Sequence, residues 1–117
     1  MINIQMIGID HSRASVEERE LFSFTKTKQK ELMEAVVRQQ GVDGCVLLST
    51  CNRMELYVSL DEKAETDLYR IICHCKQISG EEEKRLREFF TVRNGEEAVR
   101  HLFLLTAGLK SKIIGED

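Results

Sequence analysis

The sequence predicts an α+β fold of the ferredoxin-like type, βαββαβ, with a four-stranded antiparallel sheet, helices on one face and a further C-terminal helix. Short segments alternate apolar and polar residues, as strands do, whereas longer segments repeat apolar residues at helical spacing. The two kinds of segment follow one another in the order β-α-β-β-α-β-α. With 117 residues, 42% of them hydrophobic, the chain is long enough for one domain with its own core.

The chain begins with a predicted strand and a short helix. Apolar and polar residues alternate from position 2 onward, and this strand is expected to end near Gly8. Ser15 and Glu18 have the spacing of a capping box, in which each side chain bonds the backbone N–H of the other residue. They predict a short helix that runs to about Phe24.

A longer helix and two strands follow. The helix is expected over about 27–40, with Gly41 as its C-terminal stop because glycine adopts the left-handed conformation that ends helices. An apolar run then predicts a strand at about 44–49, and period-2 alternation predicts another at about 54–60.

The last part of the chain supplies two helices around one strand. An apolar stripe predicts a strongly amphipathic helix from Ala64 to Ile78. A fourth strand is expected near 89–92. Asn94 is predicted to cap a final helix that ends at Gly108.

Composition and charge exclude several classes of protein. The formal net charge is −3, so no general electrostatic field attracts nucleic acid. No apolar run approaches about 18 residues, and there is no signal-peptide pattern. Four cysteines at irregular spacing do not make a disulfide framework. We therefore expect a soluble, cytoplasmic protein with no membrane partner.

The segment Ser-Thr-Cys-Asn-Arg-Met-Glu, residues 49–55, connects the two middle strands. Cys51 is therefore expected at a tight connection, held rigidly but open to solvent. A nearby cation favours the nucleophilic thiolate, and Arg53 lies two residues away. Free cysteines also pack as small hydrophobic residues, and the residues alone leave both roles of Cys51 open. Cys45 and Cys75 are expected in the core.

Other candidate residues give weaker indications. The run from Cys73 to Cys75, with His74 between, resembles a metal motif, but neighbouring helical side chains diverge, so no metal site is predicted. His101 lies one step from the apolar stripe of the last helix, and a lone histidine there is more often structural than catalytic. No glycine-rich nucleotide fingerprint follows a strand, so no cofactor-binding residue is predicted.

Four separated blocks of this chain resemble the N-terminal catalytic domain of glutamyl-tRNA reductase, in the order of that family. The resemblance covers essentially the whole chain. The family usually has Asp at the position of Lys110 and Pro near Ser15, and this chain departs at both. The matching blocks are Gly8–His11 with Arg19 and Glu20, Leu48–Arg53 with Glu55 and Tyr57, Glu97–Phe103, and Ala107–Leu109 with Ser111, Gly115 and Glu116.

The resemblance implies a thioester mechanism. Cys51 would attack the ester carbonyl of glutamyl-tRNA, and NADPH would reduce the resulting thioester to glutamate-1-semialdehyde for tetrapyrrole biosynthesis. Thr50, Arg53 and Ser111 would bind the glutamyl group. His101 would polarise the carbonyl or handle the proton of the leaving ribose oxygen. A turn after Gly108 would then have to bring Ser111 back toward the cysteine.

The resemblance also implies how the domains are divided. Residues 1–117 would form a single N-terminal catalytic domain, without the NADPH-binding and dimerisation domains of the full-length enzyme. This fragment would bind no NADPH and show at most thioester formation or esterase activity. We expect the fragment to be a monomer and the full-length enzyme a homodimer, with glutamate-1-semialdehyde aminomutase as a candidate partner.

Two other classes of function stay open. The first is a non-catalytic RNA- or protein-binding ferredoxin-like module, although no strand interleaves basic and aromatic residues as RNA-stacking sheets do. The second is a redox-sensing thiol protein, in which Cys51 would need a resolving cysteine. Cys45 is the nearest in sequence, but six extended residues span about 20 Å.

Overall fold

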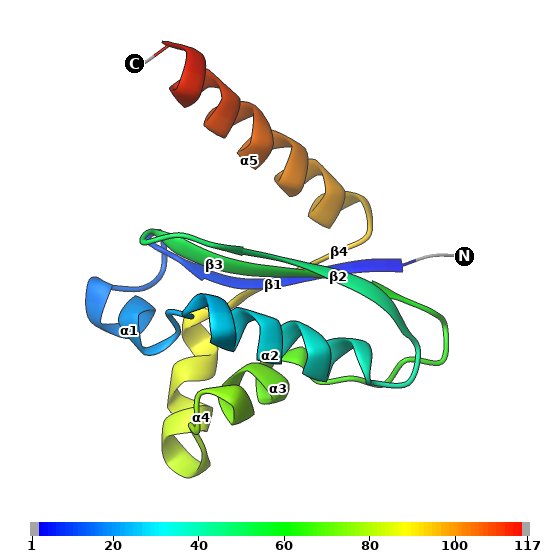
Figure 1. The fold of residues 1–117 in the computed structure, drawn as a ribbon. Helices are drawn as coiled ribbons and strands as arrows, with labels where there is room; N and C mark the ends of the chain where they lie inside the picture. Colours follow the sequence, from blue (N-terminus) through cyan, green and yellow to red (C-terminus); the bar gives the residue numbers. More distant parts are fainter. Residues whose placement is uncertain (1–2, 116–117) are drawn as a thin grey trace.

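The computed structural model describes residues 3–115 of the chain, with side chains described for residues 3–107. Its sheet has the strand order β2-β3-β1-β4, and every neighbouring pair is antiparallel. This order confirms the predicted ferredoxin-like α+β arrangement (Figure 1). The strands are β1 (Asn3–Asp10), β2 (Val42–Ser49), β3 (Arg53–Leu60) and β4 (Thr91–Asn94).

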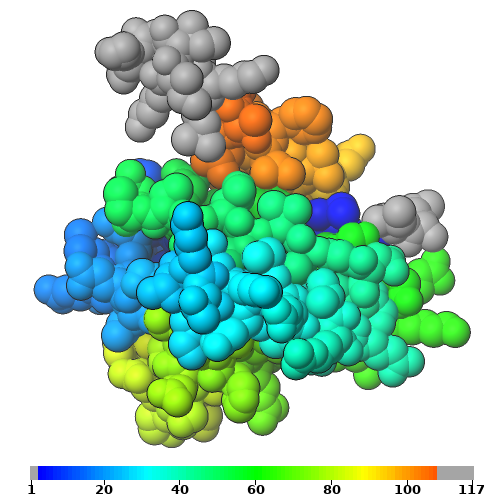
Figure 2. Space-filling view, in the orientation of Figure 1, coloured from blue at the N-terminus to red at the C-terminus, as the bar shows by residue number. Residues whose placement is uncertain are grey.

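Helices cover both faces of the sheet. Four α-helices and a short 3-10 turn lie on one face, and the last helix, α5 (Glu96–Gly115), lies alone on the other (Figure 1). Residues 96–107 of α5, coloured from yellow to orange, lie above the body of the molecule in the space-filling view (Figure 2). The elements of the first face are α1 (Val16–Leu21), α2 (Lys26–Val37), α3 (Leu68–Cys75), α4 (Gly80–Leu86) and η1 (Arg87–Phe89).

The larger core fills the space between the sheet and the four helices. Strand alternation directs Met54, Leu56 and Val58 of β3 into this core, where all three are buried. Leu32 of α2 and Ile72 of α3 meet them from the helical side. Each such side chain stabilises the fold by about 1.5–3 kcal/mol through burial.

A smaller core joins the sheet to α5. Met6 of β1, Tyr57 of β3 and Ala98 of α5 are buried there. Leu48 and Leu102 pack against them while partly exposed. β3 is therefore covered on both faces, so side chains that point to either face of the sheet can be buried.

The predicted helix from Ala64 to Ile78 is shorter in the structure. α3 begins after Asp67, whose side chain accepts a hydrogen bond from the backbone N–H of Arg70 at 3.3 Å. It ends before Gln77, which has a φ of 58° and turns the chain out of the helix. The apolar stripe continued past both ends, because apolar loop residues also pack against the core.

The predicted cap and stop of the last helix are wrong. The Asn94 side chain belongs to β4 and accepts a hydrogen bond from Gln5 Nε2 of β1 at 2.9 Å. Gly95, with a φ of 58°, makes the turn into α5 instead. The helix then continues through Gly108 to Gly115. A glycine inside a helix costs only about 1 kcal/mol relative to alanine, so it does not end a helix by itself.

The capping box that was predicted near the start of the chain is present. The Ser15 hydroxyl accepts from the backbone N–H of Glu18, and the Glu18 carboxylate accepts from the backbone N–H of Ser15 at 2.9 Å. This cap fixes the start of α1, which then lies beside the loop that joins β2 to β3 (Figure 1).

Candidate active site

The β2–β3 hairpin presents Cys51 at its tip. β2 ends at Ser49 and β3 begins at Arg53, whose carbonyl accepts a hydrogen bond from the Thr50 backbone N–H at 2.8 Å. Inside the loop, the Asn52 N–H donates to the Thr50 hydroxyl oxygen at 3.2 Å. The loop is thus held by its own hydrogen bonds, and the Cys51 side chain is exposed.

The other three cysteines belong to the packing of the domain. Cys73 is buried, and Cys45 and Cys75 are half-buried against the larger core. Burial raises the pKa of all three thiols. Cys45 also donates weakly to the Met33 carbonyl of α2, with the sulfur 3.9 Å from the oxygen. Cys45 therefore points into the helical layer, which gives Cys51 no resolving partner from that strand.

Glu55 is a buried carboxylate at the centre of the site. It is 2% exposed and faces α5, opposite in direction to the residues of β3 in the larger core. Its Oε2 accepts hydrogen bonds from Arg53 Nη1 at 3.3 Å and from His101 Nε2 at 2.9 Å. Its Oε1 accepts from the Tyr57 hydroxyl at 3.0 Å. Such partners are what a buried carboxylate needs, because a buried charge without hydrogen bonds is costly.

Gly8 makes the space for this carboxylate. It lies opposite Glu55 in the β1–β3 register. A Cβ on Gly8 would lie 2.8 Å from the Glu55 Cγ and 2.7 Å from the Met54 carbonyl oxygen. Real Cβ atoms do not approach other atoms so closely, so the glycine is needed for close backbone approach.

Asp10 supplies a second anion to Arg53. The register pairs the two residues, and Arg53 Nη1 lies 3.7 Å from Asp10 Oδ2. Burial alone would raise the pKa of Asp10, but hydrogen bonds from the side chain and backbone of Ser12, with Arg53 beside it, lower that pKa below its usual value. Arg53 is therefore held between two carboxylates, on the face of the sheet toward α5.

Tyr57 and His101 complete the group around Glu55. Burial, and then the Glu55 carboxylate beside it, raise the pKa of the Tyr57 hydroxyl, so this group stays a hydrogen-bond donor. A carboxylate only accepts, so His101 donates to it from Nε2 and has Nδ1 left for another partner. The carboxylate thereby fixes the orientation of the imidazole ring.

Two cavities flank the cysteine loop. One of about 420 Å³ lies toward α1 and is lined by Cys51, Thr50, Arg53 and Arg19, among others. The other, of about 700 Å³, lies on the α5 side and is lined by Thr50, Arg53 and Leu105, among others. Cys51 lines only the first of them.

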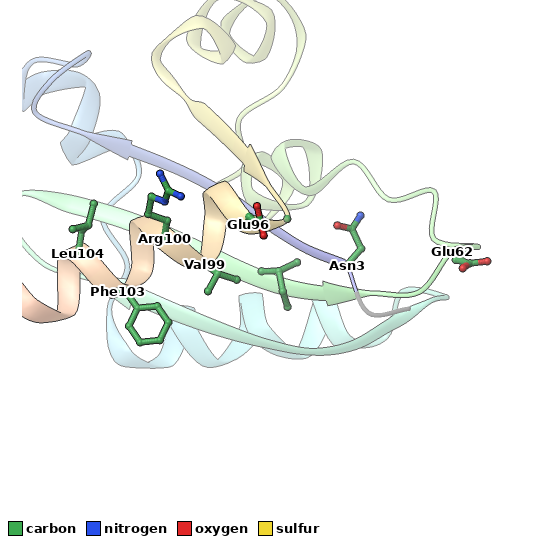
Figure 3. A pocket seen from close by; sticks show the side chains of 9 residues that line it. Asn3, Glu62, Glu96, Val99, Arg100, Phe103 and Leu104 are labelled. Carbon is green, nitrogen blue, oxygen red and sulfur yellow. The ribbon is translucent and has the colours of Figure 1, made fainter.

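A cavity larger than either of these lies elsewhere. It has a volume of about 860 Å³ and is lined by Asn3, Val99, Arg100 and Phe103, among others (Figure 3). None of the predicted site residues lines it. The candidate site therefore does not coincide with this larger cavity.

The structure brings together most of the predicted site residues. Thr50, Cys51 and Arg53 share the hairpin, and Arg53 and His101 share the Glu55 carboxylate. The side chain of Ser111 lies outside the described residues. The turn that was predicted to bring it back is absent, because α5 continues without a break.

Sequence reasoning missed Glu55, Asp10 and Tyr57 as parts of the site. The period-2 pattern placed Glu55 on the polar face of its strand, and that much is correct. The pattern gave no sign that α5 covers this face. A carboxylate and a tyrosine two residues apart, beside an arginine, were the available signal.

Two further findings concern a metal site and a membrane span. In the part of the chain that the structure describes, no three His, Cys, Asp or Glu side chains come close enough to hold a metal ion. Within that part, no helix has the length and apolar character needed to cross a membrane.

Residues 7–117 match the family described as glutamyl-tRNAGlu reductase, N-terminal domain. A glutamyl-tRNA reductase of Alkaliphilus oremlandii is 35% identical over 116 residues, which are 99% of this chain and 34% of that protein. A probable multifunctional siroheme biosynthesis protein HemA of Ruminiclostridium josui is 37% identical over 118 residues, 100% of this chain and 22% of that protein.

A solved structure shows the same relationship. The glutamyl-tRNA reductase from Methanopyrus kandleri superimposes with a TM-score of 0.63 at 33% sequence identity. The match covers 97% of this chain and 24% of that one. The chain thus spans about a third or less of the length of the relatives described here.

Proposed function

We propose that Cys51 is the nucleophile of a thioester mechanism, because this chain belongs to the glutamyl-tRNA reductase family, as its N-terminal domain. The exposed thiol at the tip of a rigid hairpin, with Thr50 and Arg53 beside it, is the observation that carries the proposal. A nucleophile needs access as well as a fixed position, and of the four cysteines only Cys51 is exposed.

In the proposed step the Cys51 thiolate attacks the ester carbonyl carbon of glutamyl-tRNA. A C–S bond forms, the C–O bond to the ribose breaks, and the ribose oxygen leaves with a proton. The products are glutamyl-Cys51 and uncharged tRNA. Covalent capture divides one difficult reaction into two easier ones. Water could then release glutamate, so the isolated domain is expected to act as an esterase.

His101 is the proposed carrier of the proton: its Nδ1 takes the proton that the Cys51 thiol releases and then gives it to the leaving ribose oxygen. Its Nε2 is occupied by Glu55, and its Nδ1 is available to a substrate group. Support for this role comes from the orienting carboxylate, which resembles the arrangement by which enzymes hold a catalytic imidazole. Glu55 then acts as a positioning residue, because it touches His101 and Arg53 and is itself buried.

Arg53 and Thr50 are the proposed ligands of the glutamyl group, with Ser111 as a further one. The guanidinium presents a planar fork that can bond both oxygens of a carboxylate. Asp10 and Glu55 hold this fork in place from one side. The substrate carboxylate would approach from the cavity on the α5 side, which Arg53 and Thr50 both line.

NADPH and the remaining partners belong to the whole enzyme in this proposal. In that enzyme NADPH supplies the hydride that turns the thioester into glutamate-1-semialdehyde. The described residues have no glycine-rich loop after a strand that fits a nucleotide phosphate, so we assign the cofactor no residue of this domain. Homodimerisation, a cytoplasmic location and contact with the aminomutase that uses the semialdehyde remain expectations for the full-length protein.

The esterase activity of the domain tests the proposal. Release of radiolabelled glutamate from glutamyl-tRNA is measured for the wild-type chain, for Cys51→Ser and for Cys75→Ser as a matched cysteine control. We expect wild-type and Cys75→Ser rates to agree and the Cys51→Ser rate to fall to the uncatalysed level. Equal release by all three chains, above the uncatalysed rate, would exclude Cys51 as the nucleophile.

A non-catalytic RNA-binding module receives less support. Ferredoxin-like RNA binders stack bases on aromatic residues of an open sheet face. Here α5 covers that face, and Tyr57, an aromatic residue of the sheet on that face, is buried.

A further inference from the structure

Arg19 is a guanidinium without an anionic partner in the cavity that holds Cys51. Its Nη1 donates to the Ala14 carbonyl at 2.9 Å, and its Nε is buried without any hydrogen-bond partner. No carboxylate of the described residues lies within 4.0 Å of it. Arg53, the other cation of this cavity, already contacts Glu55 and Asp10. A guanidinium that lines a ligand-sized cavity and has no carboxylate partner is free to bind an anion there.

The position of this cavity suggests which anion would bind. It lies on the α1 side of the cysteine loop, and the proposed glutamyl ligands line the cavity on the α5 side as well. A substrate whose ester carbonyl meets Cys51 with its glutamyl group toward α5 must direct its ribose toward α1. The first anionic group beyond that ribose is the phosphodiester that joins the terminal nucleotide to the rest of the RNA.

We propose that Arg19 binds the terminal phosphodiester of the RNA substrate and so positions the ester at Cys51. The inference rests on the proposed function for the identity of the substrate. A guanidinium forms charge-assisted hydrogen bonds to a phosphate, and Arg19 has a second terminal nitrogen, Nη2, besides the Nη1 that donates to Ala14. Buried Ile9, Phe22 and Met54 line the same cavity, and an apolar wall strengthens such an ionic contact.

Glu20 also lines this cavity, and its carboxylate is exposed. Solvent screens an exposed charge, so its repulsion of a phosphate is small compared with a direct guanidinium contact. The guanidinium groups of Arg19 and Arg53 therefore make the cavity favour an anionic ligand. Because Arg53 is shared with two carboxylates, Arg19 is the cation that distinguishes an anionic from a neutral linkage.

The test is a double-mutant cycle that changes Arg19 in the protein and the last phosphate in the RNA. The RNA carries no glutamyl group. Two short oligonucleotides with the sequence of the tRNA acceptor end are compared, one natural and one with a neutral methylphosphonate at its last linkage. Their affinities are measured by fluorescence anisotropy for the wild-type chain, Arg19→Gln and Arg38→Gln. Arg38 is the matched control, an exposed arginine on the outer side of α2 that pairs with Glu34 at 3.6 Å.

We expect the wild-type chain and Arg38→Gln to bind the natural oligonucleotide about tenfold more tightly than the neutral one, as a charge-assisted hydrogen bond predicts. Arg19→Gln should bind both equally. If Arg19 only supports the fold through Ala14, its substitution lowers the affinity for both oligonucleotides by the same factor. That result, or no binding of the natural oligonucleotide by the wild-type chain, would overturn the inference.

The RNA carries no glutamyl group, so the assay is independent of thioester chemistry. Coupling between Arg19 and the last phosphate, without any Cys51-dependent esterase activity, would support the inference and reject the proposed nucleophile. Cys51-dependent esterase activity without this coupling would support the proposed nucleophile and overturn the inference about Arg19.

Discussion

Replacing Glu55 by glutamine is expected to destabilise the domain by about 2 kcal/mol. Glutamine has nearly the same shape but no charge. Its carbonyl can take the place of Oε2, which accepts from Arg53 and His101. Its amide nitrogen then faces the Tyr57 oxygen, which can accept a hydrogen bond in place of donating one.

The magnitude follows from the two bonds that lose their charge. A hydrogen bond to a charged group contributes about 1.5–3 kcal/mol, and a neutral one about 0.5–1.5 kcal/mol. Each of the two bonds therefore weakens by about 1 kcal/mol. The carboxylate is 2% exposed, so solvent screens little of this difference.

Urea unfolding followed by circular dichroism measures the loss, because the free energy of unfolding extrapolates linearly to water. Glu34→Gln is the matched control, since Glu34 pairs with Arg38 on the exposed surface of α2. Its expected cost is about 0.5 kcal/mol or less. If Glu55→Gln cost no more than Glu34→Gln, Glu55 would not be the charged anchor of Arg53 and His101.

Three further predictions follow from the same geometry. The raised pKa of Tyr57 means that its contribution to stability is complete below about pH 10, the usual tyrosine value, and is lost as pH rises through the folded pKa. Unfolding free energies at rising alkaline pH should therefore fall less steeply for Tyr57→Phe than for the wild-type chain, and parallel curves would contradict this. Gly8→Ala should lower the free energy of thermal unfolding by about 1–3 kcal/mol through overpacking. Gly44→Ala is the control, because a Cβ there meets no atom within 4 Å and should change this free energy little. Equal losses in the two variants would contradict the close approach at Gly8. A thiol reagent should modify Cys51 first and Cys73 only on unfolding, as mass mapping of early time points would show, and early modification of Cys73 would contradict its burial.

The local features of the fold could be predicted from the sequence. An apolar run before a polar segment and period-2 alternation after it predict the hairpin, and the hairpin by itself exposes Cys51. The spacing of Ser15 and Glu18 predicts the cap because both groups lie within one helical turn. These features depend on residues that are close in the chain.

Features that depend on a third layer could not be predicted. Alternation shows that Glu55 and Leu56 face opposite sides of β3, but not that α5 covers the side of Glu55. The same limit explains the role of Gly8, which depends on its neighbour in the sheet. Gly108 was given the wrong role because a glycine ends a helix only where the chain turns to the left-handed conformation.

Intact mass spectrometry of this chain after brief incubation with glutamyl-tRNA and rapid acid quenching tests most directly whether Cys51 is the nucleophile. We expect one added glutamyl group, mapped to the peptide that contains Cys51 and released by hydroxylamine as a thioester is. The adduct should be absent from Cys51→Ser and present in Cys75→Ser. A glutamyl adduct on any other cysteine, or its persistence in Cys51→Ser, would contradict the assignment of Cys51 as the nucleophile.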